Sequence, residues 1–158
     1  MEIKKVNILW TGGLDSSCRI IELSRMNVEI QPYYIWDTTR DSIKQEIRAM
    51  KRITQDVQNH PQTRAIIYPV KIIQDCEIKD DAEITKAWTI LNQKYALGSQ
   101  YDYLARFAKQ YKLKLEAVLI SFDKFVKHDL DECNLYHSFC GFSKEFIIDG
   151  QPSEVFQP

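Results

Sequence analysis

The order in which two kinds of apolar pattern follow one another constrains this chain most. Short apolar runs typical of buried β-strands alternate with stretches where apolar residues recur every three or four positions, as on one helix face. The strand-like runs cover residues 6–10, 28–35, 65–70, 115–120 and, more weakly, 145–148. Strands that alternate with helices pair in parallel through right-handed crossovers. We therefore predict a doubly wound α/β fold, a three-layer sandwich around a parallel sheet of about five strands.

Four helical patterns lie between these runs, with apolar positions that begin at Leu14, Ile43, Ile84 and Leu104. Ser42 precedes Gln45 at the spacing of a capping box. Ser99 precedes Asp102 in the same way. The acidic pair at 80–81 also fits a helix N-terminus and needs no chemical role. These signals place the helix starts close to the ends of the preceding loops.

The length and charge of the chain limit its organisation and partners. Its 158 residues are the size of one ordinary domain, so we predict a single domain over 1–158, with a poorly patterned segment at 122–158. The acidic stretch 73–83 is predicted as a loop that leads into a helix. A net charge of −1 gives no global field toward nucleic acid or anionic membrane, so it favours a small-molecule partner. Homo-oligomerisation stays open.

The length of the apolar runs and the spacing of the cysteines predict the cellular compartment. No apolar run approaches the roughly 20 residues of a membrane span, and the start MEIKK lacks the apolar region of a signal peptide. The four cysteines are widely spaced, as reduced thiols rather than a disulfide framework would be: Cys18, Cys76, Cys133 and Cys140. We expect a cytoplasmic protein without a membrane partner.

Small and polar residues gather at 11–17, TGGLDSS, where the first predicted strand turns into a helix. Ligands of open α/β sheets bind outside the carboxyl ends of strands, where the strand order reverses. Gly12 and Gly13 permit backbone angles and a close approach that a Cβ would forbid. Successive N–H groups and a helix N-terminus attract phosphate oxygens. Further donors are the hydroxyls of Thr11, Ser16 and Ser17. The segment therefore predicts a phosphate-binding loop.

Asp15 is the residue that an anion site does not explain by itself. A carboxylate beside phosphates is unfavourable unless a cation lies between them, so Asp15 would help to hold Mg²⁺, directly or through water. The alternative is a helix cap that favours the dipole. Because Asp15 lies within TGGLDSS after a predicted strand, we favour the magnesium role.

The TGGLDSS segment differs from the commoner phosphate loops, because it lacks the Lys-Ser/Thr ending of a Walker loop and the third glycine of a dinucleotide fold. It resembles the PP-loop, S/T-G-G-x-D-S, of the N-type ATP pyrophosphatases, whose fold is adenine nucleotide α-hydrolase-like and thus Rossmann-like. In that family the loop grips the β- and γ-phosphates. A substrate oxygen attacks the α-phosphorus to give an adenylated intermediate and pyrophosphate, and a nitrogen or sulfur nucleophile then displaces AMP. The resemblance implies ATP binding by residues 11–17, Leu14 included, with Asp15 and Ser16 in catalysis.

The resemblance covers roughly residues 5–121 and is nearest to the 7-cyano-7-deazaguanine synthases. It implies an AMP-forming ligase that makes a C–N bond in 7-deazapurine (queuosine-type) biosynthesis, with ATP, Mg²⁺ and a small carboxylate-type substrate. The segment YYIWDTTR, at 33–40, resembles the family's adenine border, which implies nucleotide contacts for Tyr34, Ile35 and Arg40. The segment ALGSQYDYLARFA, at 96–108, resembles a helix start that faces the nucleotide, which implies contacts for Gly98, Ser99 and Gln100.

Structural roles compete with several of these assignments. Tyr34 and Trp36 are either stacking platforms or ordinary core and rim residues. Asp37 either orients a ribose or forms an ordinary turn, and Arg40 is either a phosphate contact or a solvated arginine. Capping alone would explain Ser99. The basic residues within 44–52 are either a solvated helix face or a neutralising group for an anionic substrate.

The chain departs from the synthases in its C-terminal part, where that family carries a cysteine-rich zinc site. Here Cys133 and Cys140 flank His137 at a spacing that is unusual for zinc, and we favour buried thiols over a zinc site. The chain is also short for the family, as though a substrate-binding tail were reduced. The alternatives are therefore an ATP-binding module that acts in a complex, and a PP-loop ligase for a protein or a nucleic-acid base.

Overall fold

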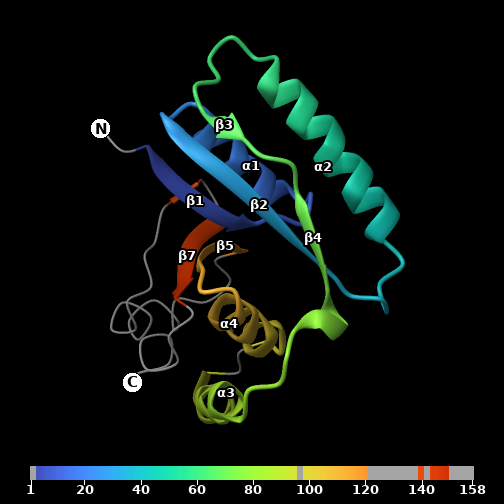
Figure 1. Cartoon of the computed structure of the whole chain (residues 1–158), viewed down its shortest axis with the longest axis vertical. Coiled ribbons are helices and arrows are strands. Elements are labelled where there is room, and N and C mark those ends of the chain that lie inside the picture. The colour runs from blue at the N-terminus through green and yellow to red at the C-terminus, as the bar shows by residue number, and fades with distance from the viewer. Residues whose placement is uncertain (1–2, 96–97, 121–138, 141–142, 150–158) are drawn as a thin grey trace.

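The computed structural model describes residues 3–95, 98–120, 139–140 and 143–149 (Figure 1). The strands are β1 (Lys4–Leu9), β2 (Val28–Trp36), β3 (Ile66–Ile67), β4 (Lys71–Gln74), β5 (Lys114–Ile120), β6 (Phe139–Cys140) and β7 (Ser143–Asp149). The α-helices are α1 (Leu14–Ser24), α2 (Ile43–Gln58), α3 (Ala82–Tyr95) and α4 (Gln100–Gln110), and the short 3-10 helix η1 covers Asp75–Glu77. Strands and helices alternate as far as β3, after which β4 follows β3 and the helices α3 and α4 precede β5.

One sheet contains all of these strands, in the order β3-β2-β1-β5-β7-β6, with β4 also paired to β2. The five strands β1 to β5 are mutually parallel, which confirms the predicted α/β fold with a Rossmann-like, five-stranded parallel sheet. The prediction for the last strand was wrong in direction. Residues 145–148 lie in β7, which pairs antiparallel with β5. A parallel strand needs a crossover, usually helical, and the sequence between β5 and β7 has little helical periodicity.

The third predicted strand, 65–70, contains only β3 at Ile66–Ile67, and a further strand, β4, follows it at Lys71–Gln74. β3 pairs with the start of β2 and β4 with its end. Pro69 lies between them and has no N–H to donate to a ladder. The buried Gln31 fills this position, because its side-chain amide donates to the carbonyl oxygens of Pro69 at 3.0 Å and Pro32 at 3.1 Å. The stretch 73–83, predicted as a loop, consequently begins inside β4.

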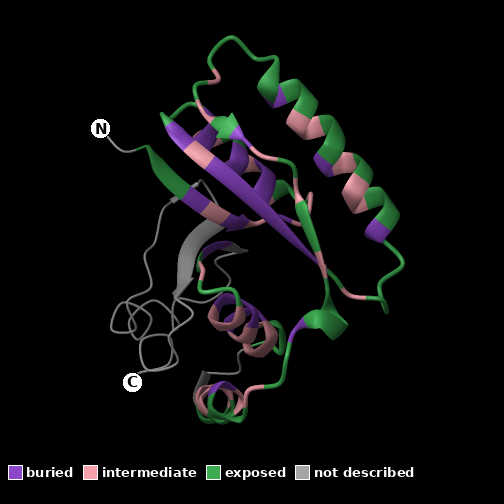
Figure 2. Ribbon diagram, in the orientation of Figure 1, coloured by how far each residue is buried: buried purple, intermediate pink, exposed green. Residues whose placement is uncertain are grey.

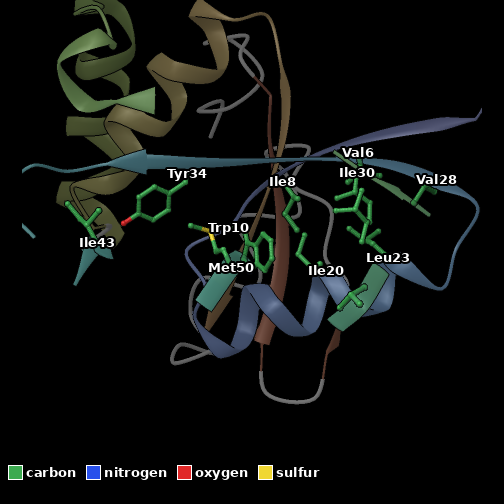
Figure 3. Packing of buried hydrophobic residues seen from close by; sticks show 12 residues of the cluster. Val6, Ile8, Trp10, Ile20, Leu23, Val28, Ile30, Tyr34, Ile43 and Met50 are labelled. Atoms are coloured by element: carbon green, nitrogen blue, oxygen red, sulfur yellow. The ribbon is translucent and has the colours of Figure 1, made fainter. Parts of the chain in front are cut away.

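Helices cover both faces of the sheet (Figures 1 and 2). On one face α1 and α2 pack on β1 and β2 around Ile8, Trp10 and Met50 (Figure 3). On the other face α3 and α4 pack around Phe107 and Leu115. Among the described helices, none has both the length and the apolar character needed to cross a membrane. The two helical layers leave the carboxyl ends of the parallel strands as one shared edge.

The predicted helix caps have mixed outcomes. Asp81 is confirmed as a cap, since its Oδ1 accepts hydrogen bonds from the N–H groups of Glu83 and Ile84, each at 3.1 Å. The capping boxes predicted at Ser42 and Ser99 were wrong, because neither side chain makes a cap hydrogen bond. Both serines have helical backbone angles, whereas an N-cap serine needs an extended backbone for its hydroxyl to reach the amides of the second and third helical residues.

Candidate functional site

The TGGLDSS segment lies where the strand order of the sheet reverses. β1 has β2 on one side and β5 on the other. The chain leaves β1 through α1 on one face and reaches β5 from α4 on the opposite face. Such a reversal opens a crevice at the carboxyl ends of the two strands, which is the ligand position of open α/β sheets. The fold thus puts this segment at a ligand-binding position.

Gly12 and Gly13 have different geometric roles. Gly12 has a φ of +71°, and a Cβ on it would lie 2.9 Å from the backbone oxygen of Glu46 and 3.2 Å from Cγ of Met50. The close approach that Gly12 permits is therefore to α2. Gly13 has φ −71° and ψ 165°, which any residue adopts. Within the described part of the chain, a Cβ on Gly13 would meet only Thr11 Oγ1, at 3.4 Å. Gly13 consequently leaves space beside the helix end.

No side chain of the described residues caps the N-terminus of α1. Gly13 is the N-cap residue, and its carbonyl accepts a hydrogen bond from the Ser17 N–H at 3.0 Å. No described residue accepts a hydrogen bond from the N–H groups of Leu14, Asp15 or Ser16. The first amides of a helix need partners from outside it, and the dipole makes that end positive. The start of α1 therefore has three amide donors for an anion.

The polar side chains of the segment divide into two groups. Thr11 Oγ1 and Ser16 Oγ lie 3.4 Å apart beside the helix start. Ser17 is buried and its Oγ accepts a hydrogen bond from Trp10 Nε1 at 3.0 Å, so its hydroxyl also anchors the core. Asp15 is half-buried and has no hydrogen bond or ion pair with a described residue, so its carboxylate is free to bind a ligand. Leu14 is 80% exposed.

Glu46 of α2 joins the TGGLDSS segment to the polar turn after β2. Its backbone oxygen faces Gly12, while its carboxylate accepts hydrogen bonds from Tyr34 Oη and Ser42 Oγ, both at 2.7 Å. The same carboxylate pairs with Arg40. Burial, and then this hydrogen bond to Glu46, raises the pKa of the Tyr34 hydroxyl, which keeps it protonated as a donor. Arg40 is thereby held by the same residue whose backbone oxygen faces Gly12, and its side chain is 45% exposed.

The sequence interpretation did not include Glu46. Its role depends on Tyr34, which lies on a different element and is twelve positions earlier. The available signal was that a tyrosine in a buried strand needs a partner for its hydroxyl. A carboxylate one turn into the next helix could supply that partner.

The other residues predicted to contact nucleotide after β2 take structural positions. The Tyr34 ring is 1% exposed and points toward Ile43 under α2, which supports its core interpretation (Figure 3). Ile35 is buried in the core on the opposite face of the sheet. Asp37 Oδ1 accepts hydrogen bonds from the hydroxyl of Thr39 at 2.5 Å and its N–H at 2.9 Å, and these bonds lower the pKa of Asp37. Asp37 thus forms a turn.

The segment Gly98–Gln100 is exposed at the start of α4. The Gly98 carbonyl accepts a hydrogen bond from Trp88 Nε1 at 3.3 Å, and no hydrogen bond between described residues joins this segment to residues 11–17. The α4 residue that approaches the turn after β2 is Tyr103, which the sequence interpretation also missed. Burial raises the pKa of its hydroxyl, and the nearby charge of Asp37 raises it further. Tyr103 of α4 therefore lies near the charged turn after β2 and packs against the core cluster that contains Ile35.

Metal ligands are sparse in the described part of the chain, which holds no group of three or more His, Cys, Asp or Glu side chains placed to bind an ion. Of the residues considered for zinc, Cys133 and His137 lie outside the described residues, and so does the side chain of Cys140. Mg²⁺ that is bound to phosphates commonly takes only one or two protein carboxylates. The lone carboxylate of Asp15 fits that mode.

No protein-family model matches the chain, and no curated protein sequence matches it. Its function is therefore inferred from the geometry of the site.

Proposed function

We propose that this chain binds ATP with Mg²⁺ at the TGGLDSS segment and cleaves it to AMP and pyrophosphate, to activate a carboxylate-type substrate. The observation that carries the proposal is the uncapped N-terminus of α1 at the reversal of strand order. The hydroxyls of Thr11 and Ser16 beside it add donors that phosphate oxygens accept. The motif's resemblance to a PP-loop supports the same activity and an adenine nucleotide α-hydrolase-like fold.

The site offers separate groups for separate parts of the nucleotide. The amides of residues 14–16 and the two hydroxyls would hold the β- and γ-phosphates. Arg40, fixed by Glu46, would add positive charge beside them. Asp15 would hold Mg²⁺, which when bound offsets the charge of the leaving pyrophosphate. The amides of residues 14–16 and the carboxylate of Asp15 have no partner among the described residues, and Arg40 is exposed.

The reaction asks the protein for position and charge rather than for a strong base. A substrate carboxylate oxygen forms a bond to the α-phosphorus, while the bond from that phosphorus to its bridging oxygen breaks and the electron pair leaves with pyrophosphate. The attacking oxygen is already ionised, so no proton has to be removed. An amine or ammonia then attacks the acyl carbon and displaces AMP. Fixed donors aimed at the leaving group supply the rate enhancement.

The test is to incubate the chain with ATP and Mg²⁺, with and without 7-carboxy-7-deazaguanine and ammonium, and to separate the nucleotides. AMP and pyrophosphate that form only with the carboxylate support the synthase-like ligase. AMP formed without it supports the pyrophosphatase chemistry with a different acceptor. ATP that binds but stays intact identifies an ATP-binding module. Failure to bind ATP at all contradicts the proposal.

A further inference from the structure

Helix α2 has two chemically opposite faces. Its apolar face packs on the sheet through Ile43, Met50 and Val57. Much of the other face is exposed (Figure 2). It carries four exposed cations, which we name the basic stripe: Lys44, Arg48, Lys51 and Arg52. At 100° per residue these positions share about 100° of the helix circumference, and at 1.5 Å per residue they extend over about 12 Å. The stripe is thus compact and faces away from the core.

The basic stripe is not neutralised within the described part of the chain. None of its four cations forms an ion pair with a described residue. Asp41 before the helix and Asp56 near its end flank the stripe without pairing to it. The cations of α4 behave differently: Arg106 and Lys109 each pair with two carboxylates. The acids in the described part of the chain therefore leave this patch unbalanced, although the net charge of the whole chain is only −1.

The stability of α2 does not account for the stripe. Like charges three or four positions apart on a helix destabilise it by about 0.2–0.5 kcal/mol per pair. Arg48 has three such neighbours in Lys44, Lys51 and Arg52. The helix dipole favours cations in the last turn, yet α2 has no basic residue there and has Lys44 in its first turn. An arrangement that costs helix stability points to an anionic partner outside the chain.

We propose that the basic stripe binds the phosphate backbone of an unpaired nucleic-acid strand, which carries the acceptor for the proposed ATP-dependent reaction. This inference rests on the proposed function. The stripe begins in the same first turn of α2 as Glu46, whose backbone oxygen lies close to Gly12, although Lys44 is on the outer side of that turn. A base that bears a carboxylate-type group in an unpaired strand can leave its stack and reach such a site. The exposed amides of Gln45 and Gln55 on this side suit polar contacts with sugars and bases.

A membrane is the less suitable partner for this face. Interfacial helices combine cations with exposed apolar side chains that enter the lipid. The apolar residues of α2 are directed into the core, and its exposed positions are polar. The net charge of the chain predicted no attraction to nucleic acid. That sum includes every charge in the chain, so it does not report a local patch of unpaired cations.

The experiment measures fluorescence anisotropy of a labelled single RNA strand of about 12 nucleotides with the full chain, over a range of salt. The stripe variant is Arg48→Gln/Lys51→Gln/Arg52→Gln. The matched control is Arg25→Gln/Lys79→Gln/Lys86→Gln, which removes three exposed cations elsewhere and changes the net charge equally. Glutamine keeps a helix propensity close to that of lysine and arginine.

We expect the stripe variant to bind RNA at least about 10-fold more weakly and to lower the slope of log affinity against log salt by about 2, since each contact contributes about 0.7. The control should bind like the unaltered chain. Equal losses in both variants, or no loss in the stripe variant, would overturn the proposal. So would tighter binding of phosphatidylserine vesicles or polyglutamate than of RNA.

ATP titration of the same proteins separates this inference from the proposed function. The stripe variant should keep its ATP affinity, because the stripe lies outside the TGGLDSS segment. If the unaltered chain binds ATP but not RNA, the nucleic-acid inference alone is wrong. If it binds RNA through the stripe but not ATP, the proposed function is wrong, and with it the role of the strand as acceptor carrier.

Discussion

The N-termini of α1 and α3 differ in whether their first backbone amides have hydrogen-bond partners. At α3, Asp81 accepts hydrogen bonds from two backbone amides and also pairs with Lys109 at 2.6 Å. At α1, the N-cap residue is Gly13, and three amides have no partner among the described residues. Uncapped amides cost stability unless water or a ligand satisfies them. The comparison separates a helix end that is complete in the fold from one that is open to a ligand.

The role of an aspartate near a helix start therefore depends on its exact position in the helix. Asp81 precedes α3 and reaches back to its amides, whereas Asp15 is the second residue of α1 and is free of partners in the described structure. Sequence alone gave a helix cap as one interpretation of both. Position relative to the first turn decides between them, because only an N-cap side chain can reach the N2 and N3 amides.

Gly12→Val should have the largest effect and should act on the fold. Its Cβ would meet the backbone oxygen of Glu46 at 2.9 Å, at a residue whose φ is +71°. Overpacking and a left-handed β-branched residue together should lower the free energy of unfolding by about 3 kcal/mol, measured by urea unfolding. Gly13→Ala is the control and should change stability little. Equal effects of the two variants would show that the geometric difference between these glycines is not real.

Asp15→Asn should come next and should act on chemistry rather than on the fold. The amide keeps the shape of the side chain but loses the charge that would hold Mg²⁺. We expect AMP formation to fall on the order of 10²-fold, as for loss of one preorganised stabilising contact. The unfolding midpoint should remain within error of the unaltered chain. A normal rate of AMP formation would remove Asp15 from the mechanism.

Asp81→Ala should lower the free energy of unfolding by about 1 kcal/mol, the usual effect of losing a helix cap. Its ATP affinity should not change, because α3 is the self-sufficient helix end. Asp80→Ala is the matched control, since the carboxylate of Asp80 is exposed and its one ion pair within the described structure is with Arg106. A change in ATP affinity on Asp81→Ala would break the distinction between the two helix ends.

The smallest effect is the pH dependence of the Asp81 contribution. The hydrogen bond from Lys109, followed by the backbone amide of Ile84, lowers the pKa of Asp81 from its ordinary 3.8. Its stabilisation is then complete above 3.8 and is lost as pH falls through the lowered pKa. The same pair raises the pKa of Lys109 above 10.5, so its contribution disappears as pH rises through that raised pKa. Urea unfolding of the unaltered chain and Asp81→Ala should therefore differ most between these limits, and a constant difference at low pH would contradict the pairing.

The parts of the fold that depend on local periodicity could be predicted from sequence. Helices α1 and α2, and strands β1 and β2, follow directly from the spacing of apolar residues. The break between β3 and β4 could not be predicted in this way, because it depends on how Pro69 faces β2.

The candidate site also has features that the sequence predicts and features that only the structure shows. The TGGLDSS segment is contiguous, so its position after β1 was readable. The contacts of Glu46 with Gly12 and Tyr34 join three elements and required the structure. The same is true of the burial of Tyr34, which removes its ring from the surface.

The most direct test of the central claim gives α1 the kind of cap that α3 already has. Gly13→Asp places a carboxylate at the N-cap, where the extended backbone suits it. By calorimetric titration we expect ATP affinity to fall on the order of 10²-fold, about 3 kcal/mol, because the new side chain occupies the amides and repels phosphate. The unfolding midpoint should stay the same or rise slightly. Unchanged ATP affinity in this folded variant would contradict the assignment of the α1 N-terminus as the phosphate site.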